Sequence, residues 1–298
     1  MQKNQTSPAA SNGANPYLRF AVAFSQLLKE GKSYPLGGMT ARAKPGAQDD
    51  APRVLLCSPH PDDECIIGAL PLRLLRERRM NVINVAITQG SRKDRQAARL
   101  EELRGACNYL GFDLVPTREN GLEKILLQTR DQEREYWNEA VGILVKIIEQ
   151  HEPQLIFLPH ANDWNSTHIG VHFLVMDALR NMPAGFYCRL VETEFWGAMS
   201  APNLMIESSP ADVADLMTAL SFHAGEVVRN PYHLRLPAWM IDNVRRGGEL
   251  LGGKGAEAPD YPFATLYRMR CWNRGKVEDL DMTSQVFSCD DSLEKLFG

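Results

Sequence analysis

Hydrophobic segments of strand length alternate with amphipathic segments of helical length through the middle of the chain. Continuous apolar runs are typical of strands buried on both faces of a sheet, and they cover residues 53–59, 81–88 and 154–160, with a shorter one at 113–116. Between these runs, apolar residues recur at helical spacing over 66–79, 94–111, 131–151 and 166–181. The alternation predicts an α/β fold, Rossmann-like and three-layered, with helices on both faces of a mostly parallel sheet.

The two ends of the chain depart from this pattern. Residues 1–15 are polar and predict disorder, an amphipathic helix follows from Pro16 to Gly31, and residues 36–52 have the composition of a linker. We therefore expect an N-terminal extension over residues 1–50 and a single domain over residues 51–298.

Past residue 188 the alternation loosens. Residues 189–199 and 203–209 have the character of strands, and residues 210–228 predict a helix. The glycine-rich stretch 245–260 lacks the Gly-Lys-Ser/Thr ending of a phosphate-binding loop. We expect it to be a flexible connection that can act as a lid.

Composition narrows the class of protein. The 298 residues are 44% hydrophobic, which is ordinary for a globular chain, and no run of about 18 apolar residues predicts a membrane span. A formal net charge of −4 argues against a nucleic-acid partner, which usually requires a basic surface. The start lacks the apolar core of a secretory signal and the six cysteines form no CxxC pair, so we expect a cytoplasmic protein with reduced thiols.

Two polar clusters directly follow strands of the predicted sheet. Residues 58–64, Ser-Pro-His-Pro-Asp-Asp-Glu, follow the first strand, and residues 159–168 follow the fourth. In the common doubly wound order these strands are neighbours where the strand order reverses, which is where such sheets bind ligands. We expect the two segments to face each other across a crevice.

The residue types in these clusters are those of a metal centre. Imidazole nitrogens and carboxylate oxygens are the ligands of catalytic zinc, which usually has three protein ligands and a water. Adjacent Asp62 and Asp63 point in different directions, so one can bind a metal while the other takes a proton from the metal's water. The candidates are His60, Asp62, Asp63, Glu64, Asp163 and His168.

These motifs resemble those of a known family. The run His-Pro-Asp-Asp-Glu at 60–64 is similar to the signature of the LmbE-like (PIG-L) zinc-dependent N-deacetylases. Residues 163–168, Asp-Trp-Asn-Ser-Thr-His, resemble the family's second motif, Asp-x-His-x-Asp-His. Arg99 and Glu102, followed by Leu-Gly at 110–111, match a pattern between the two, so that the resemblance spans roughly residues 53–180.

The resemblance implies a function and a set of roles. It implies Zn²⁺, or another divalent first-row metal, held by His60, Asp63 and His168, with Asp62 as the general base for attack by zinc-bound water. It implies hydrolysis of the N-acetyl group of an N-acetylglucosamine-type substrate, so the expected partner is a small-molecule amino-sugar derivative. Several relatives assemble into oligomers, which leaves a homo-oligomer open.

The sequence departs from the family pattern at the second motif. Asn165 stands where the family has a histidine, and Thr167 where an aspartate commonly orients that histidine. An asparagine amide can donate a hydrogen bond to an oxyanion but cannot supply a proton, which would then have to come from protonated Asp62. Asn165 is equally a natural helix N-cap, so both roles stay open. Gly90-Ser91 also stands where the family usually has Gly-Glu. The family's substrate specificity is therefore not carried over to this chain.

Several other residues are candidates for the site on less evidence than the motif residues. Arg92 and Arg99 are candidate substrate contacts, although Arg99 could equally form a structural ion pair. Trp164 could stack on a sugar ring or close the pocket wall. We expect Asp163 to orient a ligand histidine and His172 to pack rather than bind metal. Further residues are expected to border the site or to be solvated on a helix surface: His160, His223 and Glu226.

Two alternatives to an N-deacetylase remain. A zinc amidase acting on a conjugate other than an acetamide would share every ligand. A catalytically silent relative that binds a metal or a sugar would explain the missing second-motif histidine.

Overall fold

The computed structural model describes residues 15–41, 50–280 and 284–297. The chain forms two compact units, Met1–Tyr34 and Pro35–Gly298. Most of the expected disordered start, and much of the expected linker, lie outside the described residues.

The first unit contains the predicted amphipathic helix. Helix α1 spans Pro16–Glu30 and is followed by the 3-10 turn η1, Gly31–Ser33. The Asn15 side chain caps the helix by accepting a hydrogen bond from the Tyr17 amide, and Pro16 occupies the first turn, where no amide hydrogen is needed. None of the α1 residues is buried.

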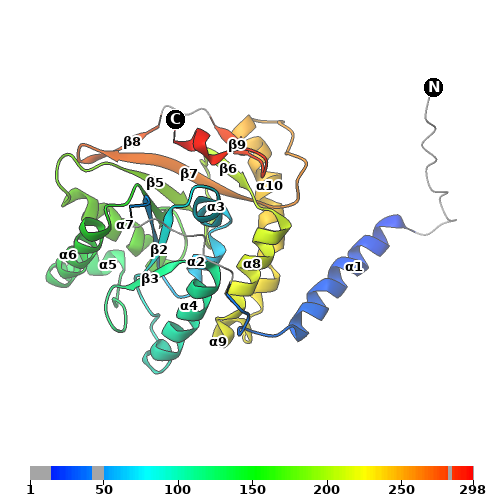
Figure 1. Ribbon diagram of the computed structural model, residues 1–298, viewed down its shortest axis with the longest axis horizontal. Helices are drawn as coiled ribbons and strands as arrows, with labels where there is room; N and C mark the ends of the chain where they lie inside the picture. Colours follow the sequence, from blue (N-terminus) through cyan, green and yellow to red (C-terminus); the bar gives the residue numbers. More distant parts are fainter. Residues whose placement is uncertain (1–14, 42–49, 281–283, 298) are drawn as a thin grey trace. The chain divides into compact units, whose positions relative to one another are not determined.

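The second unit is built on a nine-stranded sheet of order β3-β2-β1-β4-β5-β7-β6-β9, with β8 paired to β7 (Figure 1). The five neighbouring strands β3, β2, β1, β4 and β5 are parallel to one another, and β7 runs antiparallel to both β5 and β6. The predicted mostly parallel α/β fold is therefore confirmed. The strands are β1 Arg53–Ser58, β2 Asn81–Ala86, β3 Asp113–Pro116, β4 Leu155–Pro159, β5 Cys188–Thr193, β6 Leu204–Glu207, β7 Ala264–Asn273, β8 Lys276–Asp279 and β9 Gln285–Phe287.

Helices cover both faces of this sheet. Side chains of α3, α4 and α8 pack on one face, and those of α6 and α7 pack on the other. The helices are α2 Asp63–Ile66, α3 Leu70–Glu77, α4 Gln96–Leu110, α5 Leu127–Gln132, α6 Arg134–His151, α7 Ser166–Arg180, α8 Pro210–Ser221, α9 Ala224–Val227 and α10 Leu236–Gly252. Short 3-10 turns are η2 Lys93–Arg95, η3 Tyr232–Leu234 and η4 Leu293–Leu296.

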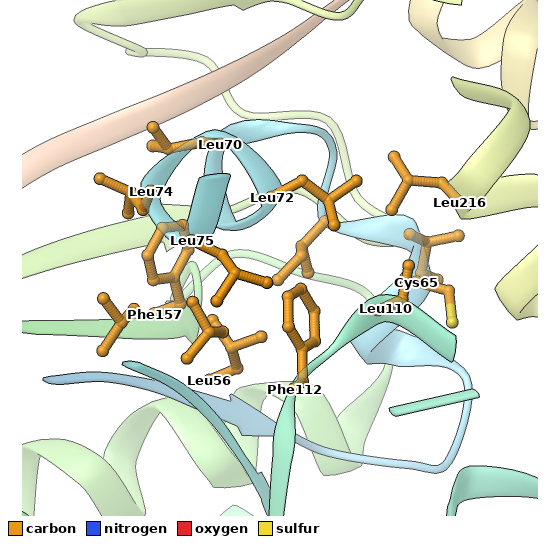
Figure 2. Packing of buried hydrophobic residues seen from close by; sticks show 14 of the residues in the cluster. Leu56, Cys65, Leu70, Leu72, Leu74, Leu75, Leu110, Phe112, Phe157 and Leu216 are labelled. Atoms are coloured by element: carbon orange, nitrogen blue, oxygen red, sulfur yellow. The ribbon is translucent and has the colours of Figure 1, made fainter. Parts of the chain in front are cut away.

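A hydrophobic core lies on each face of the sheet, because successive side chains of a strand point to opposite faces. In β1, Val54 and Leu56 belong to the cluster with α3, whereas Leu55 and Cys57 belong to the cluster with α6 and α7. Figure 2 shows the leucines of α3 gathered with Leu56, with Phe157 of β4 and with Phe112. A strand with apolar residues on both faces has to be covered on both sides, which explains the continuous apolar runs in the sequence.

The glycine-rich stretch 245–260 was predicted to be a flexible connection, and for its first half that prediction is wrong. Its first half continues α10 as far as Gly252. Gly247 and Gly248 are buried, and a Cβ on Gly247 would lie 2.5 Å from Met205 Sδ, while one on Gly248 would lie 2.9 Å from the Ala258 backbone. These glycines allow close packing of the helix rather than flexibility.

Two predicted helices are interrupted. Of residues 66–79, Ile66 ends α2 and the helix resumes as α3 at Leu70, with Pro71 in its first turn, where proline is tolerated. Residues 210–228 divide into α8 and α9 around His223. Among the described helices, none combines the length and the hydrophobicity needed to cross a membrane.

Candidate active site

The two polar segments meet at the carboxyl edge of the sheet. Strands β1 and β4 are parallel neighbours, with Val54 opposite Leu155, and the order β3-β2-β1-β4-β5 reverses direction between them. The loop after β1 leads into α2, and the loop after β4 leads into α7. This is the crevice position expected for a ligand site in a doubly wound sheet.

Three candidate metal ligands converge there. His60 Nδ1 lies 3.2 Å from His168 Nε2, and Asp63 Oδ2 lies 3.5 Å from the former and 3.3 Å from the latter. Ligand atoms placed tetrahedrally about 2.0–2.1 Å from a zinc ion are about 3.4 Å apart. Asp63 Oδ1 is buried and has no hydrogen-bond partner among the described residues. The donor set and its spacing therefore fit zinc.

Surrounding carboxylates fix His168. Its side chain is fully buried, with Nε2 directed at Asp63 and Nδ1 3.7 Å from Asp163 Oδ2. Burial opposes the imidazolium, but the two carboxylates outweigh it and raise the pKa of His168 to about 9. Burial would raise the pKa of Asp63, but His168 and His60 hold it well below its usual range. A cation in this pocket is thus electrostatically favoured, whether a proton or a metal.

Asp163 lies in the position expected of a residue that orients a ligand histidine. Its carboxylate faces His168 and accepts hydrogen bonds from the backbone amides of Asn165, at 2.8 Å, and Gly197, at 3.3 Å. It joins the loop after β4 to the segment after β5.

Asp62 lies beside the metal-ligand cluster in an unusual backbone conformation. Its φ is 112°, and its amide donates to Glu64 Oε2 at 2.9 Å. The Tyr232 hydroxyl donates to Asp62 Oδ2 at 2.5 Å. Burial, reinforced by the charge of Asp63, raises the pKa of Asp62 to about 6, which is suitable for a group that accepts and returns a proton near neutral pH.

His223 is buried in the second unit rather than solvated on a helix surface, so that expectation was wrong. Its Nε2 lies 2.7 Å from Glu64 Oε1, and Glu64 itself is fully buried. Burial disfavours the charged imidazole, but Glu64 and Asp62 raise the pKa of His223. His223, Glu64 and the Asp62 amide form a chain of hydrogen bonds at the end of the loop that follows β1. Glu226, also expected on the surface, is half-buried and pairs with Arg229.

Asn165 occupies the N-cap position of α7. Its Oδ1 accepts hydrogen bonds from the amides of Thr167, at 2.9 Å, and His168, at 3.4 Å. Because the oxygen faces the helix, the amide nitrogen faces away from it.

Arg99 holds the loop that follows β1. Its Nη2 donates to the Pro61 carbonyl at 3.0 Å, and its charge lowers the pKa of Asp62. A Cβ on Gly90 would lie 2.2 Å from Arg99 Nη1, so the glycine leaves room for this guanidinium.

The other predicted residues lie outside the cluster. Arg92 is exposed and pairs with Asp94 at 2.7 Å. Trp164 is 76% exposed and packs beside Gly197. His160 is buried against the Gly197 carbonyl at 2.8 Å, and His172 contacts the Pro159 carbonyl at 2.8 Å, consistent with packing.

The sequence did not point to Tyr232 or Phe195. Tyr232 reaches Asp62 from η3, and the Phe195 ring packs edge-on against His168 with centroids 4.9 Å apart. Tyr232 belongs to no predicted element, and the strand-like pattern of residues 189–199 does not single out Phe195 as a site residue. For His223 there was a signal, since Ser221–Glu226 weakly resembles a family segment.

A Rossmann-like sheet that places two histidines and an aspartate at zinc-ligand spacing defines an α/β protein with a candidate metal centre at its switch point. Residues 55–179 match the family model described as PIG-L, GlcNAc-PI de-N-acetylase. The predicted resemblance to the PIG-L (LmbE-like) family is therefore confirmed over these residues.

Solved structures share this fold at low sequence identity. N,N'-diacetylchitobiose deacetylase from Pyrococcus horikoshii is 16% identical, with a TM-score of 0.53 over 89% of this chain and 96% of that one. GalB, the 4-carboxy-2-hydroxymuconate hydratase from Pseudomonas putida, is 14% identical, with a TM-score of 0.52 over 73% and 95%. The conserved protein TT1542 from Thermus thermophilus is 18% identical, with a TM-score of 0.51 over 72% and 93%. No curated protein matches the sequence.

Proposed function

We propose that this protein is a metal-dependent hydrolase that removes the N-acetyl group from an N-acetylglucosamine-type substrate. The observation that carries the proposal is the triangle of ligand atoms from His60, Asp63 and His168, with edges of 3.2–3.5 Å, beside the buried carboxylate of Asp62. The family match over residues 55–179 and the fold shared with a chitobiose deacetylase support it.

The residues around the triangle have complementary tasks. A divalent ion bound there, Zn²⁺ or another first-row metal, would act as a Lewis acid toward the amide carbonyl and activate a water molecule. Asp62 takes a proton from the attacking water and returns it to the departing amine. Tyr232 holds the Asp62 carboxylate in place through its hydrogen bond.

Two residues support the reacting amide without exchanging protons. The Asn165 amide nitrogen, which faces away from helix α7, donates to the developing oxyanion. Arg99 keeps the Pro61–Asp62 loop in position.

The amino-sugar part of the substrate is assigned to a polar cavity of about 390 Å³ on the His60 side of the cluster. Ser91, Lys93 and Lys124 line it and offer hydrogen-bond donors to hydroxyl groups, with Lys93 paired to Glu123 and Lys124 to Glu133. Trp164 offers an exposed indole at the edge of the site, whereas a contact with Arg92 would require its pair with Asp94 to break.

Metal analysis and acetate release from a panel of N-acetyl sugars test the proposal together. The purified protein should contain close to one equivalent of divalent metal, and Asp62→Asn should keep that metal while kcat falls by about 10²–10⁴. His168→Ala should lose the metal. An Asp62→Asn protein with nearly normal turnover would contradict the assignment of the general base, and a wild-type protein without turnover of any amide would favour the silent relative.

A further inference from the structure

An apolar cavity lies beside the candidate active site, on a different side from the polar one. Its volume is about 410 Å³, and Ile66, Phe195, Trp196, Tyr232, Leu236 and Trp239 form its apolar wall. A volume of this size is within the range of pockets that bury a whole small molecule, and an acetyl methyl group would fill only a small part of it.

The cavity adjoins the candidate reacting groups, because two residues of its wall contact them. Phe195 packs against the imidazole of His168, and the Tyr232 hydroxyl bonds to Asp62. Ile66 ends α2, the helix that begins at Asp63. A group held in the cavity would therefore be separated from the reacting groups by no more than one side chain, Phe195 or Tyr232.

The wall is suited to an aliphatic or aromatic group. The rings of Trp196 and Tyr232 meet edge to face, with centroids 6.2 Å apart, and Trp196 remains 43% exposed. Exposed aromatic side chains around a concave surface gain free energy by covering an apolar ligand.

Most of the charge at the rim of the cavity is balanced within the protein. Arg246 is paired with Glu194 at 2.7 Å and with Asp242 at 2.9 Å, so its charge is already balanced. Arg235 donates to the side chain of Asn230 at 3.2 Å.

We propose that the substrate is an amide with an aliphatic or aromatic group close to the scissile bond, and that the cavity walled by Trp196, Tyr232 and Trp239 binds this group. The proposal rests on the function proposed above and specifies its substrate class. The two cavities, one polar and one apolar, then receive the two ends of an amphipathic amide.

Two substrate series on the metal-loaded protein test which end is apolar. The first lengthens the acyl group of N-acyl-glucosamine from acetyl to octanoyl, and the second lengthens the alkyl aglycone of N-acetyl-glucosaminides from methyl to octyl. In one series kcat/KM should rise by about fourfold for each added methylene until the cavity is filled. A rise in the acyl series identifies a deacylase of longer chains, and a rise in the glycoside series identifies a deacetylase of apolar glycosides.

Variants locate the effect. Trp239→Ala should flatten the rise to less than about twofold per methylene, and Trp196→Ala should reduce it. Tyr187→Ala is the matched control, because it removes a 47% exposed ring directly before β5, at the opposite edge of the sheet. This control should keep the slope of the wild type. The rise of kcat/KM per methylene is measured on the wild type, so the cavity proposal can be tested even if a tryptophan variant fails to fold.

A binding measurement separates this proposal from the proposed function. Octanoate should bind more tightly than acetate and change the tryptophan fluorescence of the wild type, and Trp239→Ala should weaken octanoate binding by at least tenfold. Flat kinetics in both series, with acetate still released, would overturn the cavity proposal and leave amide hydrolysis intact. If no amide is turned over, the proposed function fails, and the octanoate result alone decides whether the cavity binds apolar groups.

Discussion

Asn165 is a single residue to which two roles are assigned, and the structure shows how to separate them. Its Oδ1 caps helix α7 at the Thr167 and His168 amides, and its amide nitrogen is the part proposed to face the substrate. Serine can supply a capping oxygen but has no amide nitrogen, whereas alanine has neither.

We expect Asn165→Ser to keep the free energy of unfolding close to that of the wild type while kcat falls by about 10²–10³. Asn165→Ala should lose the same activity and also about 1 kcal/mol of stability. Urea unfolding and acetate release on the same samples measure both. If Asn165→Ser is fully active, the residue is a cap and nothing more.

The buried pair of Glu64 and His223 is the other feature that belongs to the residue scale. Both side chains are almost completely buried, and the pair holds the amide of Asp62 through Glu64 Oε2. Removing one member leaves the other as a buried group without its partner, which costs far more than the pair contributes in total.

His223→Ala should therefore lower the free energy of unfolding by about 3–5 kcal/mol. Glu64→Gln combined with His223→Ala should cost less than the sum of the two single changes, as measured by a denaturant double-mutant cycle. Arg104→Ala, which removes one member of an exposed pair with Glu101, is the control and should cost under about 1 kcal/mol. Simple additivity of the two changes would show that Glu64 and His223 are not coupled.

At the scale of elements, helix α7 is held close to the chain that precedes α5. Gly170, two residues after His168, is buried, and a Cβ there would lie 2.0 Å from the Ile125 carbonyl oxygen. Backbone cannot yield as the end of a flexible side chain can, so this approach fixes where α7 places its histidine. Gly142 in α6 has open space around its Cα and provides a comparison within the same layer.

Gly170→Ala should destabilise the protein by about 1–3 kcal/mol through overpacking, although alanine favours helices. Gly142→Ala should instead be neutral or stabilise by up to about 1 kcal/mol, because only helix propensity changes. Thermal or urea unfolding of both variants measures the contrast, and metal content should fall only for Gly170→Ala. Equal stability of the two variants would mean that α7 can shift freely.

The sequence predicts an element correctly when the residues that determine its structure lie within the element itself. The strands around Leu55 and Ile156 are recognisable because two-sided burial requires a continuous apolar run. Helix α10 was misjudged at Gly247 because flexibility and close packing both call for glycine, and only the position of Met205 decides between them.

At the scale of the whole molecule, the site joins segments that are far apart in the chain. The proximity of His60 and Asp63 to His168 could be predicted because both segments follow strands, and strand order places the strand ends side by side. Their roles as metal ligands were implied by the family resemblance alone. Tyr232 could not, since it is 170 residues from Asp62 and reaches it through the packing of the last third of the chain. Phe195 could not be predicted either, because its contact with His168 depends on the path of the chain after β5.

Loss of the metal should lower the thermal stability of the whole fold. The ligand cluster joins β1, α2 and α7, and without a cation Asp63 keeps a buried oxygen without a partner among the described residues. Binding at about a hundred times the dissociation constant stabilises by about 2.7 kcal/mol, so a chelator should lower Tm by roughly 5–10 °C in calorimetry. His168→Ala should show no such response. A wild-type Tm that is insensitive to chelation and to added Zn²⁺ would argue against a metal at this cluster.

The positive φ of Asp62 has a practical consequence for finding the unknown substrate. At φ 112° most side chains are strained, whereas asparagine tolerates left-handed backbone better than alanine does. Asp62→Asn therefore removes the base while keeping the shape of the loop. Such a protein should retain its natural ligand uncleaved, so that incubation with metabolite extracts followed by mass spectrometry could recover the molecule that the wild type would destroy.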